Sequence, residues 1–144
     1  MISPADKKDY PVLIAVWESA VKATHDFLSD EDFEFYKKHI PIYFEHVSLY
    51  KYKDEKGVVK AFLGVADNSI EMLFVDNESR GSGVGKILLD YAVNKLNARN
   101  VDVNEQNKQA LDFYYHFGFK EVSRDEYDGE GKGYPILHLV KPEE

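Results

Sequence analysis

Apolar and polar positions alternate along the chain in two periods, one helical and one extended. Over residues 6–23 the apolar positions recur at helical spacing, which predicts an amphipathic helix with one apolar face. Ser29 precedes a run of acidic residues, a pattern typical of a helix N-cap and its first turn. A second helix is therefore expected from this point toward Ile40, with Pro41 near its end.

The middle of the chain has the composition of extended structure. Residues 47–52 and 58–65 are predicted to form the two strands of a hairpin, because the turn-forming run 54–57 lies between them. A further turn precedes residues 70–75, which are mostly apolar. An apolar run of this kind predicts a central strand that is buried on both faces.

The last part of the chain continues the alternation of helix and strand. Apolar spacing predicts a helix over residues 84–96, and a short strand is predicted at 101–103. A second helix is predicted over 107–117, with Gly118 at its end, and the last two strands at 119–122 and 136–140. This order of elements predicts a mixed α/β fold, and no linker-like segment interrupts it. We therefore expect residues 1–144 to form a single domain.

Composition and charge narrow the chemistry. The chain has no cysteine, which excludes disulfides, thiolate zinc sites and a covalent acyl-cysteine intermediate. The histidines show no metal-ligand spacing, so no metal site is predicted. The formal net charge of −8 repels a phosphate backbone and disfavours nucleic acid as a partner. No segment resembles a membrane span or a secretory signal, so a cytoplasmic location and no membrane partner are expected.

A glycine-rich loop connects the strand predicted at 70–75 to the helix that follows it. Its sequence is Arg80-Gly81-Ser82-Gly83-Val84-Gly85. Such a loop can direct several backbone N–H groups toward one point, and the helix N-terminus adds roughly half a positive charge there. Glycine also lets an anion approach the backbone closely. An acidic protein can therefore bind a polyanionic ligand at this loop without many basic side chains.

Two common phosphate-binding motifs do not fit this loop. The Walker motif requires Gly six residues before its Lys and a hydroxyl residue after it, but Arg80 and Ile87 stand at these positions relative to Lys86. The dinucleotide-binding pattern G-x-G-x-x-G fails because its last position is Lys86 or Leu88. The pattern that remains is R-x-x-G-x-G.

This pattern resembles the coenzyme A pyrophosphate loop of the GCN5-related N-acetyltransferase (GNAT) superfamily. A second signature of the superfamily follows in the expected order, at Asn107, Ala110, Phe113-Tyr114 and Gly118-Phe119. The resemblance implies the GNAT fold, with a central mixed, mostly antiparallel sheet flanked by about four helices. It also implies acetyl-CoA as cosubstrate. The sequence departs from the family in its first strand, which is very short because only residues 1–3 can form it. Dimers are frequent in the superfamily, so a homodimer is among the expectations.

The same resemblance implies which residues contact the cosubstrate. The backbone of Leu73, Phe74 and Val75 would polarise the thioester carbonyl, and Tyr114 would protonate the leaving thiolate. Further contacts are implied for Arg80, Gly81, Ser82, Gly83, Val84, Gly85, Lys86 and Asn107. The alternatives are a core role for the Tyr114 ring, an N-cap role for Asn107 and a solvated Lys86.

Glu71 is the best acidic candidate for the base that deprotonates the amine. It lies four residues before Val75, and the period of a strand places both side chains on one face. Carboxylates are uncommon in an otherwise apolar strand. The alternatives are an outward-facing or ion-paired Glu71, with water as the base or with an amine that arrives neutral.

The acceptor site of the superfamily is lined by the connection between the first two helices and by the last hairpin loop. His25 and Asp26 fall in the first of these regions and Tyr134 in the second. Asp26 would attract a cationic acceptor, and His25 would either relay a proton or pack within its loop. Trp17 either packs in the core or walls the acceptor pocket. Asn104 ends a predicted strand, where it would bind the pantetheine arm or the substrate.

The leading hypothesis is direct transfer of the acetyl group of acetyl-CoA to a primary amine in a ternary complex. The alternative is a non-catalytic acyl-CoA-binding regulatory module, and a purely structural interaction domain is a third. The sequence leaves open whether the acceptor is a small molecule or an amine of a protein.

Overall fold

The computed structural model describes residues 1–143, and the chain divides into two compact units. The first unit is Met1–Ala98 and the second begins at Arg99. Helices and strands occur in both units, which confirms the mixed α/β class. In the described part of the chain, no helix combines the length and the apolar character needed to cross a bilayer.

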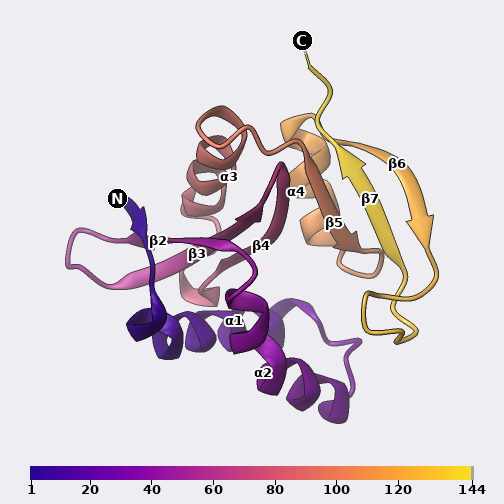
Figure 1. Ribbon diagram of the computed structural model, residues 1–144, viewed down its shortest axis with the longest axis horizontal. Helices are drawn as coiled ribbons and strands as arrows, with labels where there is room; N and C mark the ends of the chain where they lie inside the picture. Colours follow the sequence, from indigo (N-terminus) through magenta and orange to yellow (C-terminus); the bar gives the residue numbers. More distant parts are fainter. Residues whose placement is uncertain (144) are drawn as a thin grey trace. The chain divides into compact units, whose positions relative to one another are not determined.

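The first unit contains four strands and three α-helices. In chain order they are β1 (Ile2–Pro4), α1 (Tyr10–Thr24), α2 (Asp30–Phe44), β2 (Ser48–Lys53), β3 (Val59–Ala66), β4 (Ser69–Val75) and α3 (Val84–Asn94), with short 3-10 helices η1 at Lys7–Asp9 and η2 at Asn77–Ser79. The strands pair antiparallel in the order β1-β2-β3-β4. Helices α1 and α2 cover one face of these strands and α3 covers the other (Figure 1).

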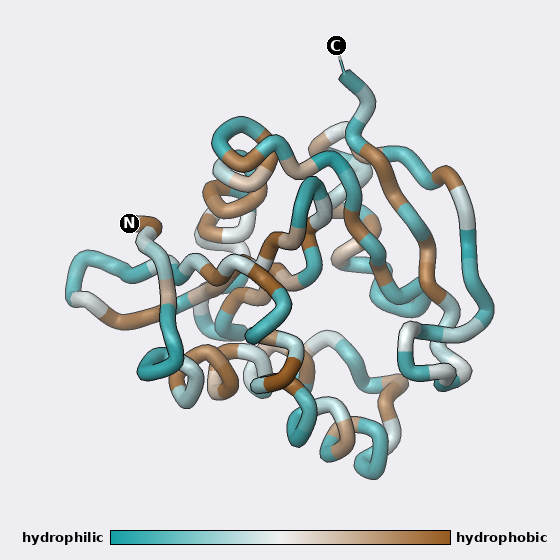
Figure 2. Tube along the Cα trace, viewed as in Figure 1, coloured by the Kyte–Doolittle hydropathy of each residue, from teal (hydrophilic) through white to brown (hydrophobic). Residues whose placement is uncertain are grey.

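The main core of the first unit is made by α1, α2 and β3. Its buried members include Leu13, Val16, Trp17, Ile40, Phe44 and Phe62. Phe44 and Phe62 meet edge to face, with ring centroids 5.6 Å apart. Apolar residues accordingly recur along α1 and the strands that it covers (Figure 2). The amphipathic helix expected over residues 6–23 is confirmed as α1, although it begins at Tyr10 and follows the 3-10 helix η1.

The buried strand of this unit is β3 and not β4. Residues 61–65 are all buried, whereas Ile70 is the only buried residue of β4. The prediction that the strand at 70–75 is buried on both faces is therefore wrong. Helices α1 and α3 contact β4 as well as β3, yet residues 72–75 of β4 are only partly buried. Apolar composition alone therefore does not decide the burial of a strand here.

Local signals determine where the helices begin and end. The hydroxyl of Ser29 accepts a hydrogen bond of 3.1 Å from a backbone N–H in the first turn of α2, so Ser29 is the predicted N-cap. Helix α2 continues past Pro41 to its end at Phe44. Helix α3 ends at Asn94, so Leu96, which was expected in its apolar stripe, lies beyond the helix.

The second unit contains β5 (Asn100–Asn104), α4 (Lys108–Phe117), β6 (Lys120–Asp125) and β7 (Ile136–Val140). Its strands pair antiparallel in the order β5-β7-β6. Buried positions alternate along β5 and β7, at Val101, Val103, Leu137 and Leu139. Helix α4 ends at Gly118, whose φ of 112° is the left-handed conformation expected of a glycine C-cap. All residues of β6 are exposed.

Candidate active site

The glycine-rich turn lies between the end of β4 and the start of α3. Gly81 and Gly83 have φ angles of 80° and 90°, a left-handed conformation that residues with a side chain rarely adopt. Gly83 is the N-cap of α3, so the chain enters the helix directly from this turn. The shape of the turn therefore depends on glycine at both positions.

The space in front of the turn is open. A Cβ atom added to Gly81 or Gly83 would meet no other atom within 4 Å. An incoming group can therefore approach the main chain closely. The first turn of α3 carries no acidic side chain that would cancel the positive end of the helix dipole. These features fit a pyrophosphate group, which binds to backbone N–H groups at the N-terminus of a helix.

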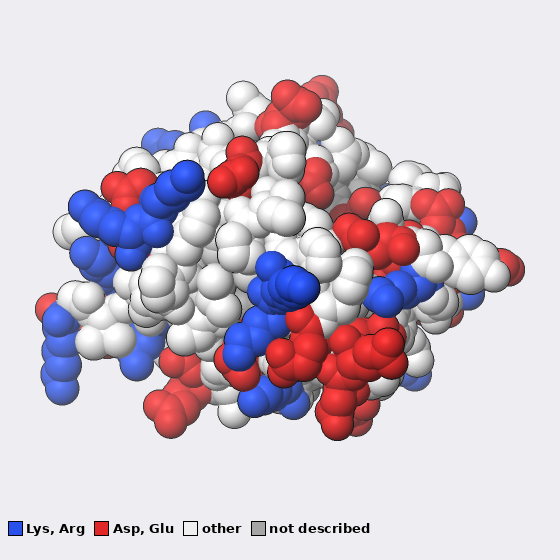
Figure 3. Space-filling model, turned by 60° about the horizontal axis from the view of Figure 1, so that its bottom comes forward, with Lys and Arg blue, Asp and Glu red and all other residues white. Residues whose placement is uncertain are grey.

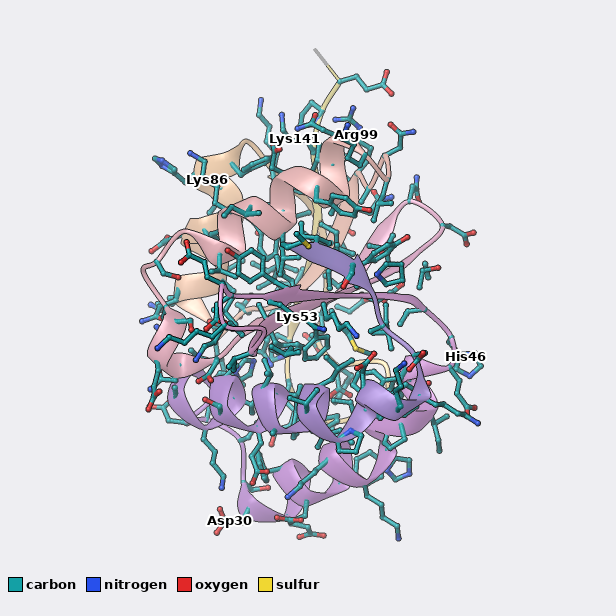
Figure 4. All side chains as sticks on the ribbon, turned by 90° about the vertical axis from the view of Figure 1, so that its left-hand side faces the viewer. Asp30, His46, Lys53, Lys86, Arg99 and Lys141 are labelled. Carbon is teal, nitrogen blue, oxygen red and sulfur yellow. The ribbon has the colours of Figure 1, made fainter. Side chains whose placement is uncertain are left out.

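Basic side chains stand at both ends of the turn. The chain carries a formal net charge of −8, and the face drawn in Figure 3 shows groups of carboxylates with basic side chains between them. Arg80 stands at the start of the turn, where its Nη1 donates to Oδ1 of Asn77 at 3.1 Å. Lys86 is exposed on the first turn of α3 and extends away from the strands (Figure 4). The hydroxyl of Ser82 donates to the carbonyl of Ser79 within the turn.

Glu71 is the extra residue of a β-bulge in β4. Ile70 pairs with Val65 and Met72 pairs with Gly64, so β4 advances by two residues where β3 advances by one. The side chain of Glu71 is exposed. A bulge interrupts the regular alternation of side chains along a strand. The spacing of four residues therefore does not show that the side chains of Glu71 and Val75 lie on the same face. Bulges often redirect a side chain next to an active site, so the candidate base remains a candidate.

Tyr114 is a buried residue of α4. Its relative exposure is 6%, and its ring packs edge to face against Phe113 and Phe119 at centroid distances of 5.2 and 5.5 Å. Burial raises the pKa of its phenol above the ordinary value of 10.0. The hydroxyl is therefore protonated at neutral pH, which is the state that a general acid requires. Tyr115, the next residue, is 41% exposed.

Asn104 and Asn107 build the turn that connects β5 to α4. The side-chain oxygen of Asn107 accepts a hydrogen bond of 3.2 Å from the N–H of Ala110, which makes Asn107 the N-cap of α4. The side-chain oxygen of Asn104 accepts one of 2.9 Å from the N–H of Gln106. Both carboxamide oxygens thus have structural partners, and the role of either residue in cosubstrate binding stays a prediction.

The connection between α1 and α2 holds His25 and Asp26. His25 is half-buried, and its Nδ1 lies 2.7 Å from Oγ1 of Thr24. Burial lowers the pKa of His25 from 6.5 to about 4, although the neighbouring Asp26 acts in the opposite direction. The imidazole is therefore neutral at neutral pH, and its lowered pKa makes it a weak proton acceptor. Asp26 is exposed, as a residue that meets a cationic acceptor would be.

Trp17 and Tyr134 occupy different surroundings. Trp17 is buried and stacks on Phe33 with ring centroids 5.2 Å apart. This arrangement matches the first of its two expected roles, packing in the core. Tyr134 is half-buried in the loop between β6 and β7, where its backbone N–H donates to the carbonyl of Lys132 at 2.8 Å. The acceptor roles expected for these two residues stay predictions.

The expected site residues are divided between the two compact units. Trp17, His25, Asp26, Glu71 and the segment 73–86 belong to the first unit. Asn104, Asn107, Tyr114 and Tyr134 belong to the second. Within the first unit the structure brings the backbone of residues 73–75 directly to the start of the segment that carries the glycine turn.

Sequence reasoning missed a histidine cluster in the second unit. Nδ1 of His138 on β7 lies 2.6 Å from Oδ1 of Asp102 on β5, and its Nε2 lies 2.7 Å from Oδ2 of Asp125 on β6. We refer to these three residues as the His138 cluster. The only sequence signal was that Asp102 and His138 stand at the polar positions of alternating strands. Their contact follows from the strand register, which pairs these two residues directly.

Comparisons with known proteins bear directly on this site. Residues 15–138 match the family model described as an acetyltransferase (GNAT) domain. The chain is 35% identical over 130 residues to the peptidyl-lysine N-acetyltransferase YjaB of Salmonella typhimurium, and the aligned segment covers 90% of each protein. YjaB of Escherichia coli is 36% identical over 128 residues, 89% of this chain and 87% of the relative. The solution structure of apo-form E. coli YjaB matches with a TM-score of 0.85 and 33% identity, over 98% of this chain and 96% of that one.

The chain therefore belongs to the GNAT family of acetyltransferases, and it is an N-acetyltransferase. Members of this family take the acetyl group from acetyl-CoA. The GNAT fold expected from the glycine loop and the second signature is confirmed. The two non-enzymatic alternatives, a regulatory acyl-CoA-binding module and a structural domain, are set aside by the same comparisons.

Proposed function

We propose that this enzyme acetylates lysine side chains of polypeptides. The support comes from the two YjaB relatives, which are named for peptidyl-lysine and align with about nine tenths of this chain. The charge of the protein is in accord with this acceptor, because a net charge of −8 attracts an ammonium group and lysine-rich polypeptides.

The observation that carries the donor assignment is the glycine turn that opens α3. Its left-handed glycines, the open space in front of them and the absence of a carboxylate in the first helical turn all suit a bound pyrophosphate. Arg80 and Lys86 add positive charge on either side of the turn. Acetyl-CoA, held there, supplies a thioester whose acyl carbon the acceptor nitrogen attacks.

Tyr114 is the proposed general acid. Cleavage of the C–S bond leaves a thiolate, and a neutral phenol can protonate it. The raised pKa of Tyr114 keeps the phenol neutral before transfer, and it also makes the phenol a weaker acid toward the thiolate. Phe113 and Phe119 hold the ring edge to face, so the hydroxyl has a defined direction.

Glu71, or a water molecule, is the proposed general base. A lysine side chain is mainly an ammonium at neutral pH, and its nitrogen can attack only after it loses a proton. Glu71 is exposed at the bulge of β4, in the strand that leads to the glycine turn. The backbone of residues 73–75 is the proposed source of the N–H that polarises the thioester carbonyl.

An acceptor panel tests the proposal. Release of the free thiol of coenzyme A is followed with a lysine peptide blocked at its N-terminus, the same peptide with arginine in place of lysine, an unblocked lysine-free peptide and a polyamine. We expect turnover with the blocked lysine peptide only, with a mass increase of one acetyl group on the lysine. Turnover of the polyamine or the free N-terminus alone contradicts the lysine assignment.

A further inference from the structure

A hydrogen-bonded connection links α1 to the segment that follows β4. The hydroxyl of Ser19 donates to Oδ1 of Asp76 at 3.0 Å and accepts from the backbone N–H of Asn77 at 3.1 Å. The same oxygen of Asp76 accepts the N–H of Glu78 at 3.2 Å and so caps η2. The backbone N–H of Asp76 donates to the carbonyl of Lys60 at 2.8 Å, next to the β3–β4 ladder. Asp76 is thus fixed by a helix on one side and by a strand on the other.

The connection continues from η2 into the glycine turn through the backbone. The N–H of Ser79 donates to the carbonyl of Asp76 at 2.8 Å, and the N–H of Arg80 donates to that of Asn77 at 3.3 Å. The N–H of Ser82 then donates to the carbonyl of Ser79 at 3.3 Å. The position of Ser82, between Gly81 and Gly83, therefore depends on where η2 begins.

We infer that Ser19 and Asp76 are positioning residues that hold the glycine turn in its cosubstrate-binding shape. The inference rests on the proposed binding of the coenzyme A pyrophosphate at this turn. Glycines have more accessible conformations than other residues, so a glycine-rich turn needs outside contacts to select one. A preformed turn costs less to order when the ligand binds, and that difference appears as affinity. Ser19 and Asp76 supply such contacts through the backbone of η2.

The negative charge of Asp76 allows a positioning role to be distinguished from a simple electrostatic effect on the affinity for coenzyme A. A carboxylate beside a pyrophosphate site repels the ligand, so electrostatics alone predicts tighter binding when Asp76 is neutralised. Positioning predicts the opposite for Asp76→Ala, which removes the acceptor for both Ser19 and the N–H of Glu78. Asp76→Asn retains an amide oxygen for these donors and should bind coenzyme A at least as well as the wild type.

The test measures the Kd of coenzyme A by titration calorimetry, together with KM for acetyl-CoA and kcat. Loss of the two hydrogen bonds of the Ser19 hydroxyl in Ser19→Ala should raise this Kd about three- to tenfold. KM for acetyl-CoA should rise in parallel, while kcat changes little, because the reacting groups are untouched. The double variant Ser19→Ala/Asp76→Ala should lose less affinity than the two single losses combined, because the two side chains share one hydrogen bond, while Ser19 also accepts from the N–H of Asn77.

Ser29→Ala is the matched control. It removes a serine hydroxyl that accepts a backbone hydrogen bond in the same unit, at the start of α2. Both serine variants should lower the melting temperature, but only Ser19→Ala should weaken the binding of coenzyme A. Wild-type affinity in Ser19→Ala, tighter binding in Asp76→Ala or an equal loss in Ser29→Ala would overturn the inference.

Gly83→Glu separates this inference from the proposed function. A glutamate at this position strains the backbone, because φ is 90°, and brings a negative charge to the turn. If folded Gly83→Glu retains coenzyme A binding, the assignment of the turn is wrong, and the positioning role falls with it. If Gly83→Glu loses binding while Ser19→Ala does not, the turn assignment stands and only the positioning role is wrong.

Discussion

At the scale of single residues, Tyr114 can serve as an acid because its surroundings keep the phenol neutral. Tyr114→Phe retains the ring and its contacts with Phe113 and Phe119 but removes the proton donor. General acid catalysis is worth about 10²–10⁴-fold, and we expect kcat to fall near the low end of this range because a thiolate is a fair leaving group. Single-turnover kinetics with acetyl-CoA and a lysine peptide would measure the loss, while the Kd of coenzyme A should not change.

Tyr115 provides the control for this experiment. It lies about 100° further around the same helix and is 41% exposed, so Tyr115→Phe should be close to neutral. The pH profile gives a second check. Because the acid form is the active one and burial raises the pKa of Tyr114 above 10.0, this residue should cause no loss of activity as the pH rises toward 10.0. Equal effects of the two phenylalanine variants would show that the acid has been misplaced.

Glu71 can be tested through the protonation state of the acceptor. If Glu71 is the base, Glu71→Gln should lower turnover most on the acidic side of neutrality, where the amine arrives as an ammonium. The affinity for coenzyme A should not change, because the glycine turn is untouched. The measurement is kcat/KM for a lysine peptide as a function of pH. A profile that matches the wild type would leave water as the base and give Glu71 a structural role.

At the scale of secondary-structure elements, the His138 cluster joins the three strands of the second unit. Hydrogen bonds to Asp125 and then to Asp102 raise the pKa of His138 above its ordinary value of 6.5. A raised pKa means that the folded state binds the proton more tightly than the unfolded state does. The stabilisation is therefore complete below pH 6.5 and is lost as the pH rises through the higher pKa of the folded protein.

The upward shift of the pKa of His138 leads to a prediction for the stability of His138→Gln. The variant should have a lower free energy of unfolding than the wild type in mildly acidic solution, and the difference should shrink as the pH rises above the folded-state pKa. Urea unfolding at several pH values measures it, with His116→Gln, an exposed residue of α4, as the control. If the loss in free energy of unfolding grows with pH, or equals the loss in His116→Gln, the cluster does not hold a charged imidazole.

At the scale of the whole molecule, the expectation of a single domain can be tested by cooperativity. Trp17 is the only tryptophan and lies in the first unit, so its fluorescence reports the unfolding of that unit. Hydrogen exchange at the amides of β7 reports the second unit. If residues 1–144 form one domain, both probes should give the same urea midpoint and free energy. Separate midpoints would show that the two units unfold independently.

Ligand binding should also act on the stability of the whole protein. Acetyl-CoA at 100 times its Kd adds about 2.7 kcal/mol to the free energy of unfolding if it binds only the folded state. We expect a rise of several degrees in the melting temperature, measured by thermal denaturation with and without the ligand. Gly83→Glu should abolish the shift, because its side chain fills the space in front of the turn. An undiminished shift in this variant would contradict the assignment of the turn.

Much of the fold could be predicted because its signals are local. The N-cap at Ser29, the left-handed glycine at Gly118 and the helix over residues 6–23 each depend on a few neighbouring residues. Capping, backbone conformation and apolar spacing act over one or two helical turns, so a linear pattern contains them. The left-handed backbone at Gly81 and Gly83 is of the same kind, since it depends on glycine at these two positions.

The sequence by itself thus determined the element order, the helix caps and the loop that identifies the family. Only the tertiary structure decided that β3 rather than β4 is buried, that Glu71 lies at a bulge, and which polar side chains meet. Ser19 and Asp76 are 57 residues apart, and Asp102 and His138 are 36 residues apart. Such contacts depend on strand register and on helix packing, which are set by the burial of many side chains at once. No short segment contains that information.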